Sequence, residues 1–258
     1  MDRHHLKNMN AKITPYLDST EGKSKQVEHM FDTISEKYDL LNNIITFRMD
    51  KSWRRKVFKI VSECHPRHIL DVATGTGDMA ILLGRTQAEN IIGVDISKGM
   101  LKIANEKISA NKLDGRIHTE VQHAESLSFA DCSFDIVNIS YGVRNFENLE
   151  KGLGEMYRVM QSDGTIVILE TSVPSNKLIK FGYLLYTEHL MPRIARIFSK
   201  DKNAYAYLSK SAINFPSGDK FLKILEESGF VKVKAIHNFL VQPPFMLVKS
   251  NNKKLASC

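Results

Sequence analysis

Cysteine is scarce in this chain of 258 residues, with three copies at positions 64, 132 and 258 and no Cys-x-x-Cys pair. That spacing suggests neither a disulfide framework nor a metal site, so we expect no bound metal and a reducing cytoplasm. Long apolar runs are also lacking and the N-terminus is polar, which predicts neither a membrane-spanning helix nor a secretory signal peptide. We expect a cytoplasmic protein that at most contacts the inner face of the membrane.

Acidic residues are outnumbered, because 29 Asp and Glu against 36 Lys and Arg leave a formal net charge of +7. Such an excess favours an anionic partner, either nucleic acid or an anionic membrane surface, although it also serves solubility alone. With 43% hydrophobic residues, a chain of this length can bury one sizeable α/β core. Composition therefore leaves the partner open.

The rest of the chain is organised around the segment from Ile69 to Gly77. Its apolar start predicts a buried strand, Gly75-Thr76-Gly77 predicts a tight turn, and a helical pattern begins at Asp78. A strand that leads through a glycine turn into a helix is the nucleotide-binding arrangement of Rossmann-like α/β folds. A second strand, 91–94, ends at Asp95, whose carboxylate can accept hydrogen bonds from both hydroxyls of a ribose.

Two ligands fit this arrangement, a dinucleotide such as NAD and S-adenosylmethionine. The spacing Gly75-x-Gly77-x-x-Ala80 is compatible with both. Asp71, inside the first strand, favours S-adenosylmethionine, because a carboxylate would repel a pyrophosphate but attract an ammonium and a sulfonium. Two other interpretations stay open, namely that Asp71 only orders the glycine turn or that the turn binds nothing. An NAD-dependent dehydrogenase is the alternative function from another class.

The rest of the chain predicts a sheet flanked by helices. Strands are expected at 115–122, 134–140, 165–169, 231–236 and 245–249, the last two as an antiparallel pair around Pro243-Pro244. Helices are expected at 98–110 after an N-cap at Ser97, at 149–160 before a turn at Asp163-Gly164, and at 219–228 before Gly229. Ligands bind at the carboxyl ends of strands in such sheets, so His123-Ala124 and the stretch from Ser140 to Asn145 belong to the expected site.

A helical segment precedes the glycine turn. Between residues 25 and 47 apolar residues recur at spacings of three and four, which predicts an amphipathic helix. Tyr38, Asn42, Asn43 and Arg48 combine aromatic, amide and charged groups in a way that suits a lid over a site, with packing alone as the alternative. We therefore divide the chain into an arm and helical lid, 1–52, and a main domain, 53–258.

A helical insertion at 174–215 interrupts the main domain and is rich in Tyr, Leu, Phe and Ile. Its helices are expected at 178–197 and 203–212. It is placed to roof a substrate pocket, although a cover for one edge of the sheet is equally compatible.

This order of elements is similar to that of the class I S-adenosylmethionine-dependent methyltransferases. More narrowly, the chain resembles the menaquinone/ubiquinone-biosynthesis C-methyltransferases from about residue 27 to 248. The glycine turn is shared by the whole class, whereas Tyr38-Asp39 followed by Asn42-Asn43 and Gly142-Val143-Arg144-Asn145 are far more specific. The resemblance implies a seven-stranded Rossmann-like sheet with helices on both faces.

The resemblance also implies the residues of the site. Thr76, Asp95, positions 123 and 124 and Ser140 would contact the cofactor, together with Asp71, Gly75 and Gly77 of the turn. His123 departs from the Asp or Asn that the family often has, which leaves the Ala124 amide as the adenine contact that can still serve. The expected contacts to the substrate are Tyr38, Asn42, Asn43, Arg48 and Asn145.

The implied reaction is methyl transfer from S-adenosylmethionine to a ring carbon of a demethylated quinol with an isoprenoid tail. We favour demethylmenaquinol as the acceptor, with the benzoquinol intermediate of ubiquinone biosynthesis as the alternative. A phenol has a pKa of about 10 in water, and the Arg144 cation would favour the phenolate. An ion pair of Arg144 with Glu147 or Glu170 that only anchors the loop is equally compatible. His189 is a weaker candidate for a base, because a helical histidine is more often packed or exposed.

A lipid-borne acceptor and a basic chain together imply peripheral membrane contact. No nucleic-acid partner is expected, because the tail after strand 134–140 lacks an Asn-Pro-Pro-Tyr stretch of the kind that stacks a flipped base. A homo-oligomer stays open.

Overall fold

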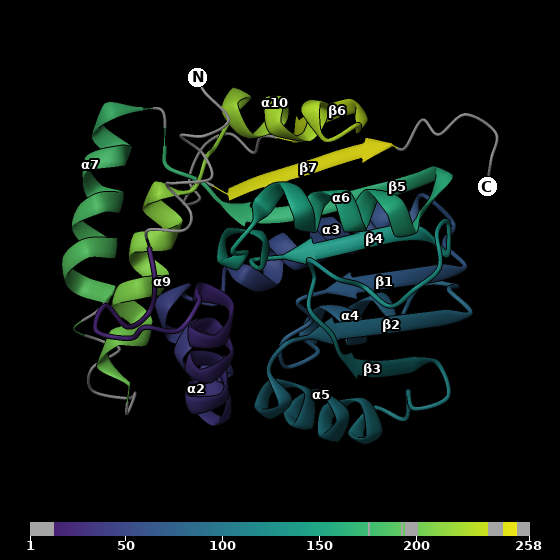
Figure 1. The fold of residues 1–258 in the computed structure, drawn as a ribbon, viewed down its shortest axis with the longest axis horizontal. Coiled ribbons are helices and arrows are strands. Elements are labelled where there is room, and N and C mark those ends of the chain that lie inside the picture. Colours follow the sequence, from purple (N-terminus) through teal and green to yellow (C-terminus); the bar gives the residue numbers. More distant parts are fainter. Residues whose placement is uncertain (1–12, 175, 192, 194–200, 237–244, 252–258) are drawn as a thin grey trace.

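The computed structural model describes residues 13–174, 176–191, 193, 201–236 and 245–251. One seven-stranded sheet in the order β3-β2-β1-β4-β5-β7-β6 forms its centre (Figure 1). The strands from β3 to β5 pair in parallel, and β7 pairs antiparallel with both β5 and β6. The predicted Rossmann-like α/β fold is confirmed. The strands are β1 (His68–Val72), β2 (Asn90–Asp95), β3 (Ile117–Val121), β4 (Phe134–Ser140), β5 (Met160–Thr171), β6 (Val231–Ile236) and β7 (Phe245–Asn251).

Helices cover both faces of the sheet because the strands send apolar side chains to both sides. On β1, Ile69 belongs to the core that includes side chains of α3 (Asp50–Ser62), α4 (Asp78–Leu83) and α5 (Lys98–Ala110). Leu70 and Val72 belong to the opposite core, with α6 (Leu149–Val159) and α10 (Asp219–Glu227). Strands buried on both faces have near-continuous apolar sequences, which is why β1 and β4 could be recognised.

The local capping signals are confirmed. Ser97 precedes α5, and its Oγ accepts a hydrogen bond from the Met100 N–H at 3.0 Å. Gly229 follows α10 with a φ of +99°, in the left-handed region that glycine adopts without strain. The antiparallel pair of β6 and β7 is also confirmed, while Pro243-Pro244 lies outside the described residues.

Residues 160–164 differ from the prediction. Strand β5 begins at Met160, directly after α6, so the predicted turn at Asp163-Gly164 lies inside the strand. Met160 pairs with Phe134 and Thr165 with Ile136, with a register shift between the two pairs. Glycine and polar residues mark bulges as well as turns, and the sequence alone does not separate the two. In addition, Cys132 is disulfide-bonded, which the cysteine spacing did not predict.

Helices from distant parts of the sequence gather beyond the carboxyl ends of the parallel strands (Figure 1). They are α2 (Lys23–Ile45), α7 (Lys177–Leu185), the π-helical η2 (Tyr186–Leu190) and α9 (Lys202–Asn214). Val27 and Met30 of α2 share a third core with Tyr205 of α9 and Met100 of α5. The helix expected at 178–197 is divided into α7 and η2, and residues 192 and 194–197 of that span lie outside the described residues. Among the helices that the structure describes, none combines the length and the apolar character needed to span a membrane.

Candidate active site

Two cavities meet where the parallel strands end. The smaller one encloses about 80 Å³ and the larger one about 500 Å³. Tyr38 of α2 and Tyr141 after β4 line both, so their rings stand between the two spaces. The lining of the smaller cavity brings together most of the predicted cofactor residues, namely Gly75, Asp95, His123, Ala124 and Ser140.

A third space of about 40 Å³ adjoins the glycine turn. Asp71, Thr76 and Ser140 line it together with Arg54 of α3, which the sequence analysis did not single out. The long separation in sequence between Arg54 and the glycine turn concealed this arrangement.

Gly75 is the open position of the turn. Its φ is +56°, and a Cβ built on it would meet no atom within 4 Å. Gly77 has a φ of +80°, and a Cβ there would lie 3.0 Å from the Cβ of Ala104 in α5. Glycine at 75 therefore leaves room for a ligand, whereas glycine at 77 allows the turn to pack against α5. Gly77 is not among the residues that line either cavity.

Asp95 lies at the end of β2 and faces the smaller cavity. Its two carboxylate oxygens accept hydrogen bonds from the backbone N–H groups of Gly75 and Ser97, each at 2.9 Å. Burial raises the pKa of Asp95 to about 6, against the opposing effect of these hydrogen bonds. Each oxygen keeps a lone pair for a further donor, which is what a ribose hydroxyl requires.

Asp71 is buried inside β1, and both of its oxygens are engaged. One accepts a hydrogen bond from Thr74 Oγ1 and the other from Asn138 Nδ2, both at 2.6 Å. Asn138 is its register partner on β4, which explains the contact. Burial raises the pKa of Asp71 to about 6. The geometry therefore gives Asp71 the loop-ordering role that the sequence had left open, through Thr74, and its contact with a cofactor stays a prediction.

His123 and Ala124 follow β3 and line the smaller cavity. The Nδ1 atom of His123 accepts a hydrogen bond from the Glu125 N–H at 3.1 Å, so in the neutral ring the hydrogen lies on Nε2. That Nε2 is 2.8 Å from the Oγ of Ser24 in the first turn of α2. The histidine thus links the sheet edge to the lid.

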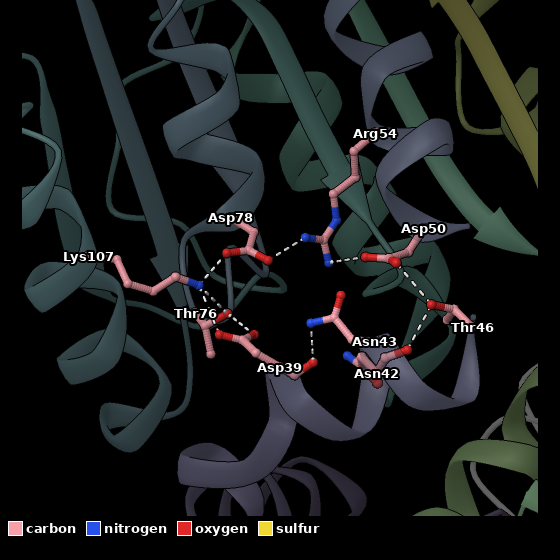
Figure 2. A network of polar contacts seen from close by, with 9 residues as sticks. All are labelled: Asp39, Asn42, Asn43, Thr46, Asp50, Arg54, Thr76, Asp78 and Lys107. Carbon is pink, nitrogen blue, oxygen red and sulfur yellow. Dashed lines mark hydrogen bonds and ion pairs between the residues drawn. The ribbon is translucent and has the colours of Figure 1, made fainter. Parts of the chain in front are cut away.

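A polar network fixes the lid helix to the glycine turn (Figure 2). Asp39 of α2 accepts a hydrogen bond from Thr76 Oγ1 at 2.7 Å and pairs with Lys107 of α5 at 2.9 Å. Lys107 also pairs with Asp78, which pairs in turn with Arg54 at 2.5 Å. Although burial alone would raise the pKa of Asp78, these two cations lower it. The network joins α2, α3, α4 and α5 around Thr76, the residue predicted to contact the cofactor.

The N-terminus of the lid is held separately. Lys23 is buried, and its Nζ donates to the carbonyl oxygens of Arg144 and Phe146 at 3.2 and 2.9 Å. Burial lowers the pKa of Lys23 to about 8. The Ser24 N–H donates to Glu147 at 3.0 Å, so Glu147 contacts the lid rather than Arg144. These contacts attach α2 to the loop after β4.

The larger cavity is mainly apolar and aromatic. Helix α2 and the loop after it contribute Tyr38, Asn42, Ile45 and Phe47, and α3 contributes Trp53 and Arg54. The insertion also lines this cavity, because α7, η2 and α9 contribute Ile179, Gly182, Tyr183, Tyr186, Thr187, Tyr205, Leu208, Ser209 and Ala212.

The other predicted substrate residues lie elsewhere. Asn43 donates from Nδ2 to the Asp39 carbonyl oxygen at 2.7 Å, and its buried Oδ1 has no hydrogen-bond partner among the described residues. Arg48 is exposed and is not among the residues lining either cavity. Asn145 lines the smaller cavity and accepts a hydrogen bond from the Tyr207 hydroxyl at 3.2 Å. His189 is exposed and lines neither cavity.

Arg144 is buried at the wall of the larger cavity. Its Nη1 lies 2.5 Å from Oε1 of the fully buried Glu170 and donates to the Tyr141 carbonyl oxygen at 2.9 Å. Burial by itself lowers the pKa of Arg144, but the attraction of Glu170 outweighs it and raises that pKa. The anchoring ion pair considered from the sequence is thus present with Glu170, and Nε has no hydrogen-bond partner among the described residues.

The sequence comparisons can now be placed beside this geometry. A sequence model of the ubiE/COQ5 methyltransferase family matches residues 19–240. The chain belongs to this family. The demethylmenaquinone methyltransferase of Bacteroides fragilis is 42% identical over 225 residues, which cover 86% of this chain and 91% of that protein. The ubiquinone/menaquinone biosynthesis C-methyltransferase UbiE of Geotalea daltonii is 42% identical over 210 residues, covering 81% and 89%.

Solved structures show the same fold. A SAM-dependent methyltransferase of Thermotoga maritima, a possible histamine N-methyltransferase, has a TM-score of 0.60 at 18% identity, covering 87% of this chain and 99% of its own. A putative O-methyltransferase of Nostoc punctiforme has a TM-score of 0.65 at 16% identity, covering 96% and 68%. The predicted S-adenosylmethionine-dependent methyltransferase is confirmed by family and fold, and nothing in these comparisons supports an NAD-dependent dehydrogenase.

The residues of the smaller cavity fit the cofactor of this ubiE/COQ5 member. Gly75 leaves open space beside the turn, and the Asp95 carboxylate ends β2 at the position for a ribose. Ligand pockets of drug-sized molecules usually measure roughly 300–1,000 Å³, so about 80 Å³ is too little for the whole cofactor. The cofactor would therefore extend beyond this cavity into the adjoining space at the glycine turn.

Proposed function

We propose that this ubiE/COQ5 family member transfers the methyl group of S-adenosylmethionine to a ring carbon of demethylmenaquinol, which yields menaquinol. The observation that carries the proposal is the junction of the two cavities at Tyr38 and Tyr141. A largely apolar space of about 500 Å³ suits an aromatic ring with the start of an isoprenoid tail. A quinol acceptor is consistent with the names of the relatives from Bacteroides and Geotalea.

Gly75, Asp95, Ala124 and Ser140 would hold the cofactor, with Asp71 and Thr76 supporting the turn. The bound cofactor supplies an electrophilic methyl group, so the task of the chain is to align the acceptor carbon and exclude water. Tyr38 and Tyr141 separate the two spaces, and the ring of the acceptor would lie against them. Asn42, from the lid, is the one of the three predicted substrate amides that lines the larger cavity.

The acceptor carbon becomes nucleophilic when the adjacent ring hydroxyl loses its proton. Arg144 stabilises the resulting phenolate, because its guanidinium lines the larger cavity and stays charged. Glu170 neutralises part of this charge, so the effect depends on the positive charge that remains on the guanidinium beyond the ion pair at Nη1. The hydroxyl proton leaves to solvent water, the sulfur keeps the electron pair of its bond to the methyl group, and the hydrogen of the methylated carbon then moves to the ring oxygen, so that one proton is released for each methyl group transferred.

The benzoquinol intermediate of ubiquinone biosynthesis is the second candidate acceptor, since the Geotalea relative is named for both pathways. We further propose that the chain works at the inner face of the membrane as a peripheral protein, because its acceptor is a lipid and its net charge is +7. Assembly into a homo-oligomer is compatible with this arrangement.

Mass analysis of the quinone pool of a strain that lacks this protein tests the proposal. We expect a menaquinone pool that is one methyl group too light, restored by the wild-type gene. If the menaquinone pool is normal and the ubiquinone pool is undermethylated, the acceptor is the benzoquinol intermediate instead. If both pools are normal, the proposal is contradicted.

A further inference from the structure

Helix α7 is the most exposed apolar element of the described chain. None of its residues, Lys177–Leu185, is buried. Leu178, Phe181 and Leu185 are 81%, 67% and 53% exposed, and their spacing of three and four places them along one face. A contiguous row of large apolar side chains in water marks a surface that contacts a partner or a membrane.

The larger cavity accounts for the apolar residues on a different face of the same helix, but not for this exposed row. Ile179, Gly182 and Tyr183 line that cavity, whereas Leu178, Phe181 and Leu185 do not. A helix that is apolar on more than one face is normally covered on each of them. The face with Leu178, Phe181 and Leu185 has no such cover among the described residues, and α7 lies at the outer edge of the molecule (Figure 1).

A further exposed apolar side chain lies on the loop after α2, near the end of α7. Phe47 is 68% exposed and its ring centroid lies 6.1 Å from that of Tyr186, directly after α7. Phe47 also lines the larger cavity, so this exposed ring belongs to the wall of that cavity. We call Phe47, Leu178, Phe181 and Leu185 the α7 surface.

Positive charge borders the α7 surface. Lys177 and Lys180 are exposed on α7, and Arg48 is exposed beside Phe47. Within residues 177–191 the sequence has one acid, Glu188. Apolar side chains between lysines and an arginine match the boundary between the anionic headgroups and the acyl chains of a bilayer. Symmetric pairing with a second copy would instead bring the same basic border against itself.

We propose that the α7 surface docks on an anionic lipid bilayer and that the larger cavity opens there toward the lipid. The docking itself follows from exposure and charge, whereas the route of a quinol ring from the bilayer into the cavity rests on the proposed function. Such a position lets the ring enter between Phe47 and Ile179, both of which line the cavity, while the tail stays in the membrane.

Co-sedimentation of the full chain with vesicles of phosphatidylglycerol and phosphatidylcholine, without quinol, tests the docking. We expect the double variant Leu178→Glu and Phe181→Glu to partition at least tenfold less than the wild type. The double variant Lys177→Gln and Lys180→Gln should lose about fivefold per lysine on anionic vesicles and keep its binding to pure phosphatidylcholine. The control Val121→Glu, at a side chain 51% exposed on β3, should bind like the wild type.

Methyl transfer to a tail-less quinol in solution, measured on the same variants, separates the two proposals. Full turnover of the Leu178→Glu and Phe181→Glu variant with weakened vesicle binding supports the docking. If this variant binds vesicles like the wild type, the docking proposal is overturned. The same holds if the variant changes from an oligomer to a monomer while its vesicle binding is unchanged. A wild-type chain that docks through α7 but methylates no quinol would contradict the proposed function and leave the docking in place.

Discussion

Asp95 and Asp71 lie on neighbouring strands, yet their surroundings give them different roles. Burial raises the pKa of each to about 6. Asp95 accepts two backbone N–H bonds and lines the smaller cavity, whereas Asp71 uses both oxygens for Thr74 and Asn138. At the scale of the residue, Asp95 therefore faces the smaller cavity and Asp71 orders the turn through Thr74, while the contact of Asp95 with a ribose stays a prediction.

Cofactor affinity should fall as the pH drops through about 6. The carboxylates are charged above their raised pKa of about 6 and neutral below it, and the charged form attracts the cationic cofactor and accepts ribose hydrogen bonds. If binding requires one carboxylate in its charged form, we expect the dissociation constant for S-adenosylmethionine to rise about tenfold for each pH unit below 6. Calorimetry from pH 8 to pH 5 measures this, and a flat profile would contradict the assignment.

The variant Asp95→Asn should weaken the binding of S-adenosylmethionine by about tenfold to a hundredfold at pH 8, since hydrogen bonds to a charged group contribute about 1.5–3 kcal/mol. It should also flatten the profile below pH 6. The exposed Asp163→Asn is the matched control and should bind like the wild type. Wild-type affinity of Asp95→Asn by calorimetry would remove Asp95 from the site.

Arg144 combines a structural contact with a position at the larger cavity. Replacing it by Ala leaves Glu170 fully buried without its ion-pair partner, so we expect the free energy of unfolding to fall by about 3–5 kcal/mol. The double variant Arg144→Met and Glu170→Gln removes both charges and should recover most of this stability, as denaturant unfolding would measure. Turnover at saturating cofactor should stay low in both variants if Arg144 stabilises a phenolate. If turnover recovers together with stability, Arg144 only anchors the loop through its ion pair and does not stabilise a phenolate.

At the scale of the element, the lid helix α2 is attached at two places. Lys23 fixes its first turn to the loop after β4, and Asp39 fixes its middle to Thr76 and Lys107. The second attachment is made to Thr76, the neighbour of Gly75, which lines the smaller cavity. The network in Figure 2 therefore sets how easily α2 moves.

The variant Lys107→Met should loosen α2 without unfolding the sheet. It removes the cation that pairs with both Asp39 and Asp78, whose side chains are about one-third exposed, so the loss in stability should be about 1 kcal/mol or less. We expect faster amide hydrogen exchange in the half of α2 around Asp39. Lys223→Met, which breaks the exposed pair with Glu227, is the control and should leave that exchange unchanged. Equal protection of α2 in both variants would show that the network does not hold the lid.

Signals that act over a few residues were predictable from the sequence. Ser97 caps α5 and Gly229 ends α10, because caps depend on the backbone within one turn. Asp95, His123, Ala124 and Ser140 were placed together because parallel strands end at one edge of the sheet. The bulge at 160–164 was missed, since the same residue types favour turns and bulges.

Contacts between distant segments were not predictable. The network of Asp39, Asp78, Lys107 and Arg54 joins four helices, and no local pattern in the sequence connects them. Arg48 was expected at the substrate from its sequence position beside the lid, but it follows the last turn of α2 and is exposed. The packing of Gly77 against Ala104 likewise depends on where α5 lies.

At the scale of the whole molecule, the sheet and the helical layer beyond it have separate tasks. The sheet edge carries the smaller cavity with Asp95, and α2, α7, η2 and α9 enclose most of the larger, apolar one. Tyr38 and Tyr141 are shared by both. The α7 surface lies on the outer side of the helical layer, so a cofactor from water and an acceptor from lipid would approach the junction from different sides.

The most direct test of the account is the position of the transferred methyl group. Purified protein is incubated with S-adenosylmethionine carrying an isotope-labelled methyl group and with reduced demethylmenaquinone, and the product is analysed by mass spectrometry and nuclear magnetic resonance. We expect the label on the ring carbon beside a hydroxyl of the naphthoquinol. A label on oxygen, or none while the protein binds S-adenosylmethionine, would contradict the proposed carbon methylation.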